Sequence, residues 1–403
     1  MSPSTKAVIV LAAFSAFSAA YPGMGRGGPG GPGGPGVPGA RGAPGASGGF
    51  GRPGNPGGPG SAGSPGSQGG FLGGLNNQGG IGARADDNQP LGDLINLPDG
   101  SLSNVGKDVK GILTAAGSPV SGDTFVGNVP ELGTPECSAD KCCVFKHFSD
   151  DVAPSFQDSQ GCTDIARAAI RLGFHDAAGW SKNTGDLGGA DGSIVLAAEE
   201  IKRAANAGLE DIVAQMKVWH GKYAQFGAGM ADLIQFAATA ATVQCPGGPR
   251  IKTFVGRKDS SVPAPDGLLP DPHDSADKLI ALFGNKTISP PGLAALVGAH
   301  TASKQRFFDP SRADAPQDTT PGTWDTLFYQ QTVSGAPSEI LTFPSDKNLA
   351  NDPRSGPAFK AFAAQAALWG GAYAAQYLRL SLLGVFNINE LTDCSKALPV
   401  GRQ

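Results

Sequence analysis

The sequence predicts a large all-α domain that follows a low-complexity N-terminal region. Glycine and proline are concentrated before residue 80, whereas from residue 137 onward alanine- and leucine-rich segments show the periodicity of amphipathic helices. Strand-like alternation of apolar and polar residues is nearly absent from residues 137–403, so few β-strands are expected there.

Residues 1–20 have the parts of a secretory signal peptide. Lys6 is followed by the apolar stretch "AVIVLAAFSAF" and then by the small residues Ser18, Ala19 and Ala20. A buried N-terminal helix is the alternative, but the glycine-rich tract that follows offers it nothing to pack against. We therefore predict secretion of the mature chain, with cleavage before Tyr21.

Residues 21–80 contain a collagen-like tract. Glycine occupies every third position from Gly27 to Gly69, which gives 14 Gly-X-Y triplets with proline in the Y position of nine. Collagen has this period because only glycine fits at the axis of its triple helix. Two interpretations remain open. The tract is either a solvated polyproline-II-like spacer, or a triple helix that trimerises the chain or attaches it to a cell wall or matrix.

Residues 81–136 are expected to form a mostly irregular linker with one helical candidate, "LSNVGKDVKGILTAA" at 102–116. The helical domain is expected to span 137–403. Its predicted helices, each marked by apolar residues at helical spacing, cover 162–178, 194–206, 209–221, 228–243, 275–283, 291–303, 325–332, 358–368 and 386–391.

The overall charge and hydropathy exclude two classes of partner. The net charge of -4 gives no electrostatic reason to expect a nucleic acid or an anionic membrane. No apolar run reaches the roughly 18 residues that a membrane-spanning helix needs.

The six cysteines agree with secretion and are Cys137, Cys142, Cys143, Cys162, Cys245 and Cys394. No pair has the CxxC spacing of a zinc site, and an even number in a secreted chain predicts three disulfides. Spacing alone leaves 15 connectivities open, since six cysteines can pair in that many ways. In a secreted chain, Asn285-Lys286-Thr287 is also a glycosylation sequon.

The stretch "RLGFHDAAGW" places ionisable residues in an otherwise apolar helix. Arg171 and His175 are four residues apart and share one helix face, while Asp176 points elsewhere. A neutral histidine beside a fixed cation can accept a proton and leave the cation to stabilise the anion. The alternative is a buried core histidine whose ring nitrogens are simply hydrogen-bonded.

His300 is the second histidine on an apolar helix, "PGLAALVGAHTAS", and two such histidines suggest a haem between them.

Four motifs follow one another along this domain: "RLGFHDA", "GGADGSI", "PAPDGLLP" and "VGAHTAS". Together they resemble the secreted fungal class II haem peroxidases of the plant-peroxidase superfamily, and the similarity covers about residues 137–395. The resemblance implies the haem peroxidase fold, with a distal part at about 137–255, a proximal part at about 256–403 and one haem b between them. It also implies an enzyme that reduces hydrogen peroxide and oxidises small aromatic donors.

By this resemblance, Arg171 and His175 form the catalytic pair on the distal side, and Phe174 is the aromatic residue beside them. His175 would take a proton from hydrogen peroxide and return it to the leaving oxygen, while Arg171 stabilises the developing charge. Asn206 in "RAANAGL" would accept from the far ring nitrogen of His175. His300 matches the proximal iron ligand, and Asp346 matches the aspartate that accepts from its other ring nitrogen.

The resemblance further implies two structural calcium ions bound by hard oxygen ligands, one on each side of the haem. The distal calcium set comprises Asp176, the Gly189 carbonyl, Asp191 and Ser193. The proximal calcium set comprises Thr301, Asp318, Thr320, the Thr323 carbonyl and Asp325. The family's disulfide pattern pairs Cys137 with Cys143, Cys142 with Cys394, and Cys162 with Cys245.

Five positions depart from particular members of the family. Manganese-oxidising members have acidic residues where this chain has Thr163, Arg167 and Ser303, and a cation at Arg167 would repel Mn²⁺. Lignin-type members use an exposed tryptophan where this chain has Ala295. Gln317 stands where an aromatic residue is usual. We therefore expect a general, low-redox peroxidase that oxidises small phenols.

Two alternatives to this function remain. One is a manganese- or lignin-type peroxidase, with one of the other tryptophans as the surface relay, although buried packing is the simpler role for most of Trp180, Trp219, Trp324 and Trp369. The other is a structural wall or matrix protein in which the collagen-like tract is the functional part and the peroxidase domain is vestigial.

Overall fold

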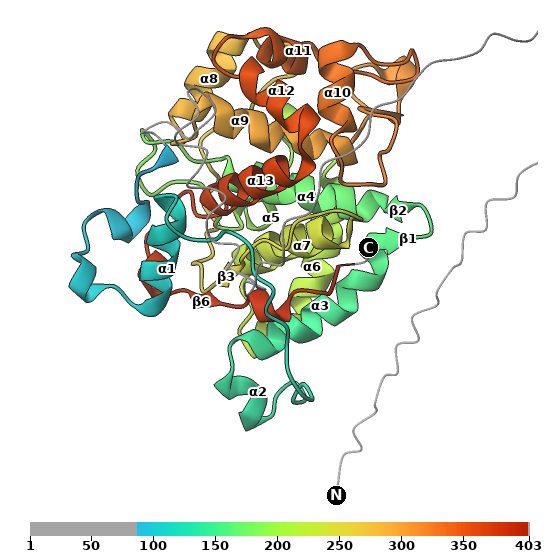
Figure 1. The fold of residues 1–403 in the computed structure, drawn as a ribbon. Helices are drawn as coiled ribbons and strands as arrows, with labels where there is room; N and C mark the ends of the chain where they lie inside the picture. The colour runs from blue at the N-terminus through green and yellow to red at the C-terminus, as the bar shows by residue number, and fades with distance from the viewer. Residues whose placement is uncertain (1–86, 402–403) are drawn as a thin grey trace, which may run out of the picture. The chain divides into compact units, whose positions relative to one another are not determined.

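Helices dominate residues 87–401, the part of the chain that the computed structural model describes (Figure 1). The signal peptide at 1–20, the tract at 27–69 and the start of the linker at 81–86 lie outside the described residues. The α-helices of the described part are α1 Asn104–Leu113, α2 Pro135–Ala139, α3 Cys142–Phe156, α4 Asp164–Ala177, α5 Ser193–Leu196, α6 Glu210–Tyr223, α7 Met230–Gln244, α8 Ala276–Gly284, α9 Pro290–Val297, α10 Leu327–Ser334, α11 Pro344–Asn351, α12 Gly356–Ala364 and α13 Ala366–Leu380.

The β-structure of the described residues consists of three antiparallel two-stranded ladders. They pair β1 Gln157–Asp158 with β2 Gly161–Cys162, β3 Phe254–Val255 with β6 Thr392–Asp393, and β4 Lys304–Gln305 with β5 Ala315–Pro316. Each strand has only two residues, which agrees with the predicted all-α class.

Two groups of helices lie on either side of α13 in Figure 1, with α3, α4, α6 and α7 in one and α8 to α12 in the other. In the first group α4 packs against α7, whose residues are all buried. In the second group α9 packs against α13 and α12.

No single helix in residues 87–401 is both long and apolar enough to cross a membrane. The pair Glu210–Phe226 and Met230–Gln244 meets that test only jointly, across a bend of 117°.

The predicted helices differ from the observed ones where tertiary contacts decide the backbone. The prediction of a helix at 194–206 is wrong, because α5 ends at Leu196 and only the 3₁₀ turn Ala204–Asn206 follows. Glu200 in this stretch accepts hydrogen bonds from Asn206 and from the Ala264 amide, contacts that a continuous helix would not provide. The segment 386–391 likewise forms only the 3₁₀ turn Ile388–Glu390.

Of two long helices, α3 was not predicted at all, and the predicted helix at 358–368 covers only the first three residues of α13. α3 contains Pro154, and α13 contains the pair Gly370-Gly371, and both residue types lower helix propensity in an interior. Packing stabilises these helices nonetheless, since Phe148 on α3 and Tyr377 on α13 are buried in the core.

The segment 87–113 is part of the packed domain. The candidate helix expected at 102–116 is present as α1, which begins at the Ser103 cap. Leu94 and Val109 are fully buried in the common core, and Asp93 accepts hydrogen bonds from the amides of Ile388 and Asn389. The backbone is mostly irregular as expected, but its apolar side chains make it an integral layer of the domain.

Three disulfides confirm the predicted pairing: Cys137–Cys143, Cys142–Cys394 and Cys162–Cys245. The second bridge joins residues 252 positions apart and ties α3 to the segment after β6.

Candidate active site

The helix α4 carries the first part of the candidate site. It begins where the Thr163 side chain accepts from the Ala166 amide, and its register places Arg171 and His175 one turn apart. The Arg171 Nε atom lies 3.2 Å from His175 Nε2. On the other side of the ring, His175 Nδ1 lies 2.9 Å from Asn206 Oδ1.

Asn206 is held in this orientation by a contact on its other side. Its Nδ2 atom donates to the Glu200 carbonyl at 2.8 Å, so the amide oxygen is the atom that faces His175. An amide oxygen can only accept, and the proton of the ring therefore belongs on Nδ1. The lone pair of His175 Nε2 is left beside Arg171.

The surroundings of His175 keep its ring neutral. Burial and, after it, the charge of Arg171 lower the pKa of His175 to about 3, and the hydrogen bond to Asn206 offsets only part of this. Burial also lowers the pKa of Arg171, without bringing this strongly basic group near neutrality. The pair thus combines an uncharged base with a fixed cation.

Two phenylalanines border the pair. Phe174 meets the His175 ring edge-on with the centroids 5.6 Å apart, and it stacks on Phe283 at 6.3 Å. Phe307 comes from the loop after His300 and is 59% exposed. A Cβ placed on Gly208 would lie 2.5 Å from the Phe307 ring and 3.4 Å from Arg171 Nη1. An exposed aromatic ring therefore lies near Arg171, a contact that the sequence did not indicate.

His300 belongs to the 3₁₀ turn Gly298–Ala302 that follows α9, whereas the prediction placed it in one helix over 291–303. Its Nδ1 atom lies 3.1 Å from Asp346 Oδ2, on α11. The Gln317 side-chain amide also donates to Asp346 Oδ2, at 3.3 Å. Asp346 is buried, and its Oδ1 atom has no hydrogen-bond partner among residues 87–401.

The distal calcium set converges where α4 meets the loop before α5. Asp176 is fully buried, and its Oδ2 atom accepts from the Gly192 amide. Burial first, then the neighbouring charges of Asp191 and Glu200, raise the pKa of Asp176 well above its usual value, and burial raises that of Asp191 to about 6. Asp176 Oδ1 and Ser193 Oγ are buried without a partner in the described part of the chain.

Gly189 is the fourth predicted member of this set, and its backbone requires glycine. Its φ is +109°, and an added Cβ would lie 2.2 Å from the Leu383 carbonyl oxygen. Orphaned oxygens and crowded carboxylates at one place fit a hard divalent cation such as Ca²⁺.

The proximal calcium set gathers around Thr301, next to His300. Thr301 Oγ1 lies 2.6 Å from Asp318 Oδ2 and 3.4 Å from both the Thr323 carbonyl and Asp325 Oδ1. Thr320 Oγ1 lies 2.8 Å from Asp325 Oδ2. Burial raises the pKa of Asp318 to about 6. Here too the oxygen-only donor set fits calcium.

The residues around His300 also fit a haem iron. A histidine whose Nδ1–H faces a carboxylate keeps its Nε2 lone pair for a metal, and the carboxylate makes the ring a stronger ligand. His300 and Asp346 have this arrangement. Arg171 and His175 on α4, together with Asn206 of the 3₁₀ turn Ala204–Asn206, supply a second group that suits a bound peroxide.

The positions tied to manganese or lignin oxidation are filled differently. Arg167 donates to the carbonyls of Cys162 and Pro321 and pairs with Asp164, which places a cation where an acidic ligand would be needed. Ala295 is fully buried. These contacts agree with the departures from the manganese-oxidising and lignin-type members that the sequence shows at these positions.

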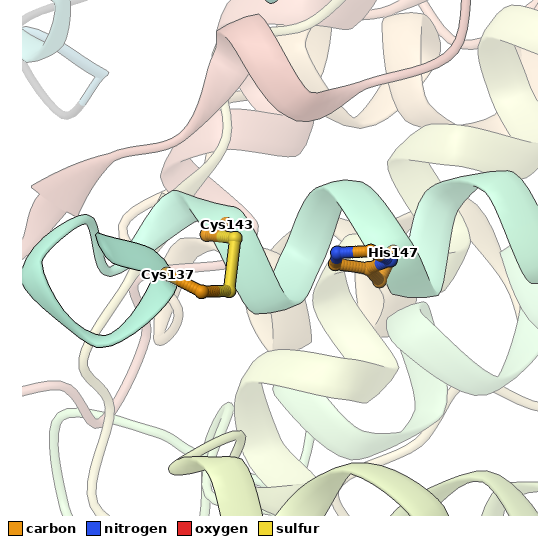
Figure 2. Close-up of side chains that lie close together, drawn as sticks. All are labelled: Cys137, Cys143 and His147. Carbon is orange, nitrogen blue, oxygen red and sulfur yellow. A yellow bond between two sulfur atoms is a disulfide. The ribbon is translucent and has the colours of Figure 1, made fainter. Parts of the chain in front are cut away.

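A further histidine lies beside a disulfide on α3. Figure 2 shows His147 one turn beyond Cys143, which is bonded to Cys137. These three residues have the types of a metal site. Metals bind cysteine as the thiolate, however, and here both sulfurs are bonded to each other in the disulfide. In addition, His147 Nε2 lies 2.7 Å from the Pro130 carbonyl oxygen. We assign this group a structural role.

Comparison with known proteins gives a consistent result. The family model of the peroxidases matches residues 148–365. A peroxidase of Arthromyces ramosus is 32% identical over 295 residues, which cover 68% of this chain and 80% of the relative. Manganese peroxidase H4 of Phanerodontia chrysosporium is 30% identical over 286 residues, covering 64% and 74%. Ligninase C of Trametes versicolor is 30% identical over 284 residues, covering 64% and 75%.

The family model covers more than half of the chain, and the first relative exceeds 30% identity over two thirds of the chain. The chain therefore belongs to the peroxidase family, among the fungal class II haem peroxidases, which are enzymes that act on hydrogen peroxide and use haem and calcium.

Proposed function

We propose that this peroxidase is of the general, low-redox type and oxidises small phenols. The observation that carries the proposal is the contact chain Asn206–His175–Arg171, in which a buried neutral imidazole lies beside a guanidinium. The haem supplies the electrons that reduce the peroxide when it is bound at His300.

His175 moves the protons of this reaction. Its neutral Nε2 accepts the proton of a peroxide oxygen, and the resulting imidazolium returns it to the other oxygen, which leaves as water. Asn206 keeps the proton of Nδ1 in place, so that Nε2 is the atom that acts. Arg171 offers its positive charge to the oxygen on which negative charge develops as the O–O bond breaks.

The choice of phenols rests on what surrounds the pair. Phe307 offers an exposed aromatic face close to Arg171, which suits a flat donor of similar size. Arg167 and the buried Ala295 argue against a manganese or lignin type. Charged or bulky donors have no comparable binding group in these positions.

We propose the calcium ligands that the family resemblance implies. Asp176, Gly189, Asp191 and Ser193 would hold one ion and fix the end of α4, next to His175. The second ion would be held by Thr301, Asp318, Thr320, Thr323 and Asp325, and would fix the turn that carries His300.

Replacing His175 by leucine tests the proposal. The rate of the peroxide reaction, followed by stopped-flow absorbance of the haem, should fall by roughly 10²–10⁴-fold, because the general base is lost. His273, an exposed histidine that pairs with Asp271, gives the matched control, and His273→Leu should react as wild type does. Equal rates for His175→Leu and wild type would refute the role of His175.

A steady-state comparison separates the donor classes. The purified enzyme would be assayed with a phenol, with Mn²⁺ and with a non-phenolic aromatic. Turnover with the phenol alone is expected, and saturable turnover of Mn²⁺ would favour the manganese type. A purified chain without the haem absorbance band would favour the structural wall protein.

We also propose that the chain is secreted, since three disulfides are formed and relatives of this class are secreted enzymes. Asn285 of the sequon is exposed and so open to glycosylation. The roles of the tract at 27–69, as a spacer, a trimerising segment or a wall contact, rest on the sequence alone.

A further inference from the structure

A connected group of buried aromatic rings leads away from His300. We call it the aromatic chain, and its members are Phe328, Tyr329, Trp369, Trp324 and Tyr373. The centroid distances are 5.5 Å from His300 to Phe328, 5.3 Å from Phe328 to Tyr329 and 5.5 Å from Tyr329 to Trp369. They are 5.3 Å from Trp369 to Trp324 and 4.8 Å from Trp324 to Tyr373. All five rings are at most 4% exposed.

Two of these rings rest directly on the backbone that carries His300. Tyr329 donates to the Ala294 carbonyl at 2.6 Å, and the Trp369 indole donates to the Ala295 carbonyl at 3.0 Å. Both side chains approach the backbone at Gly298, where an added Cβ would lie 2.3 Å from the Tyr329 hydroxyl and 2.5 Å from Trp369 Nε1. The missing side chain of Gly298 is what lets the rings approach.

The chain holds two kinds of oxidisable ring, which differ in what oxidation requires. A phenol must release its proton when it loses an electron, and Tyr329 donates to a carbonyl, which is a poor base. Burial also raises the pKa of both phenols in the chain, Tyr329 and Tyr373, above the usual value. An indole can lose an electron and keep its N–H. The two tryptophans are therefore the rings that can hold an electron vacancy.

The arrangement of the two tryptophans suits such a charge. Trp324 and Trp369 are stacked almost parallel, with 8° between the ring planes. Parallel rings with centroids 5.3 Å apart are offset, and offset stacking is already favourable between neutral rings. When one ring is positive, the neighbour's negative face attracts it, as in a cation–π contact.

Packing alone does not account for Trp324. Its Nε1–H is buried and has no acceptor among residues 87–401. An unpaired buried donor is destabilising, and a phenylalanine would avoid this cost although it leaves part of the indole's volume empty. The indole is thus retained at an energetic cost.

We propose that the stacked pair Trp324–Trp369 is an internal electron donor, which reduces the oxidised haem by one electron when no external reductant is present. The inference rests on the proposed function, since it takes His300 as the iron ligand. Overall, hydrogen peroxide would take two electrons from the bound haem and two protons from solvent, and its two oxygens would end as two waters. The haem would then regain one electron from the pair along the aromatic chain and the other from a phenol. The pair is left as a radical cation until a further phenol returns its electron.

The pair would protect the haem from damage by peroxide in the absence of donor. The test uses the haem-loaded, full-length protein, mixed with a small excess of hydrogen peroxide without donor. Electron paramagnetic resonance should show an organic radical in wild type. Mass spectrometry of peptides should then find added oxygen at Trp324 and Trp369.

The variants are Trp324→Phe and Trp324→Phe/Trp369→Phe, with Trp219→Phe as the matched control. Trp219 is also buried, but it packs against Phe148 and Phe156, apart from the aromatic chain. The single variant removes the unpartnered N–H together with one ring of the indole, at a residue that does not contact His175, Arg171 or His300 in the aromatic chain, and it should keep its turnover of phenol. It should lose the tryptophan radical and lose activity severalfold faster in peroxide, whereas the control should match wild type.

The outcomes separate this inference from the proposed function. If peroxide causes no change in the haem absorbance of wild type, the proposed function fails. If the absorbance changes but wild type carries its radical or added oxygen at Trp219, at Trp180 or on no tryptophan, the internal donor is overturned and the peroxidase function stands. The wild-type peptide map decides this even if a variant does not fold.

Discussion

His175 and His300 have the same side chain, and their neighbours give the two rings opposite tendencies. Burial and the charge of Arg171 lower the pKa of His175, so its ring stays neutral and can act as a base. Asp346 accepts from His300 and enriches its ring in electrons, so it suits a metal. The sequence indicated all four residues: helical spacing brought Arg171 and His175 together, and the family resemblance supplied the role of Asp346 beside His300. It did not indicate the contact of Gln317 with Asp346, which depends on the path of a loop.

The pH dependence of the peroxide reaction follows from His175. The base is active when neutral, that is, above its pKa of about 3. The second-order rate with peroxide should therefore stay constant as pH falls from neutrality and decrease only near pH 3. Stopped-flow rates across this range, with circular dichroism at each pH to confirm folding, would check it. A decline centred near the ordinary histidine value would contradict the assigned environment.

Gln317 offers a second test at this scale. Its amide donates to the same Asp346 oxygen that faces His300, and so competes for that oxygen's electron density. Replacing Gln317 by leucine should strengthen the Asp346–His300 bond and lower the reduction potential of the bound haem iron. Spectroelectrochemical titration measures this. Asp346→Asn is the opposing control and should raise the potential, and a rise in Gln317→Leu would contradict the argument.

At the scale of elements, the helices that carry the site begin at signals visible in the sequence. Thr163 caps α4, and Ser289 followed by two prolines begins α9. The ends were less predictable. α9 tightens into a 3₁₀ turn at Gly298, where Tyr329 and Trp369 press on the backbone, and these rings come from distant parts of the chain. Helix ends set by such contacts leave no local pattern.

The link between α8 and α9 contains a buried lysine with a measurable consequence. Lys286 is fully buried, its ammonium donates to the Trp180 carbonyl, and burial lowers its pKa to about 7. Above pH 7 the unfolded chain keeps a proton on this lysine that the folded chain releases. The unfolding free energy should therefore rise with pH between about 7 and 9.

Urea unfolding at several pH values would measure this slope. Lys286→Met keeps the length of the side chain and removes its titration, so its slope over the same range should be smaller. Lys278→Met alters an exposed lysine on α8 and provides the control. Identical slopes for Lys286→Met and wild type would contradict the prediction.

Over the whole molecule, the packed domain begins well before the region that matches the family model, residues 148–365. The amino-acid composition of residues 81–136 predicted irregular backbone. Composition could not reveal that the scattered leucines are buried against α13 and the C-terminal segment. Burial of this kind depends on long-range contacts. Arg379 on α13, for example, donates to the carbonyls of Gln89 and Leu113.

This layer should contribute to global stability. Leu94→Ala should lower the unfolding free energy by about 2–5 kcal/mol, since it empties a fully buried site. The adjacent Ile95 is 62% exposed, and Ile95→Ala should change stability by roughly 0.5 kcal/mol or less. Chemical unfolding of both variants makes the comparison. Equal, small effects would mean that the segment unfolds independently of the helices.

The bridge between Cys142 and Cys394 closes most of the domain into a covalent ring. A protease that cuts the backbone once anywhere inside this ring produces two pieces that remain joined. Where the cut lies between α4 and His300, the piece with α4 and the piece with His300 would separate only after reduction. A nicked enzyme could thus keep both halves of its active site together, and its damage would be visible on a reducing gel but hidden on a non-reducing one.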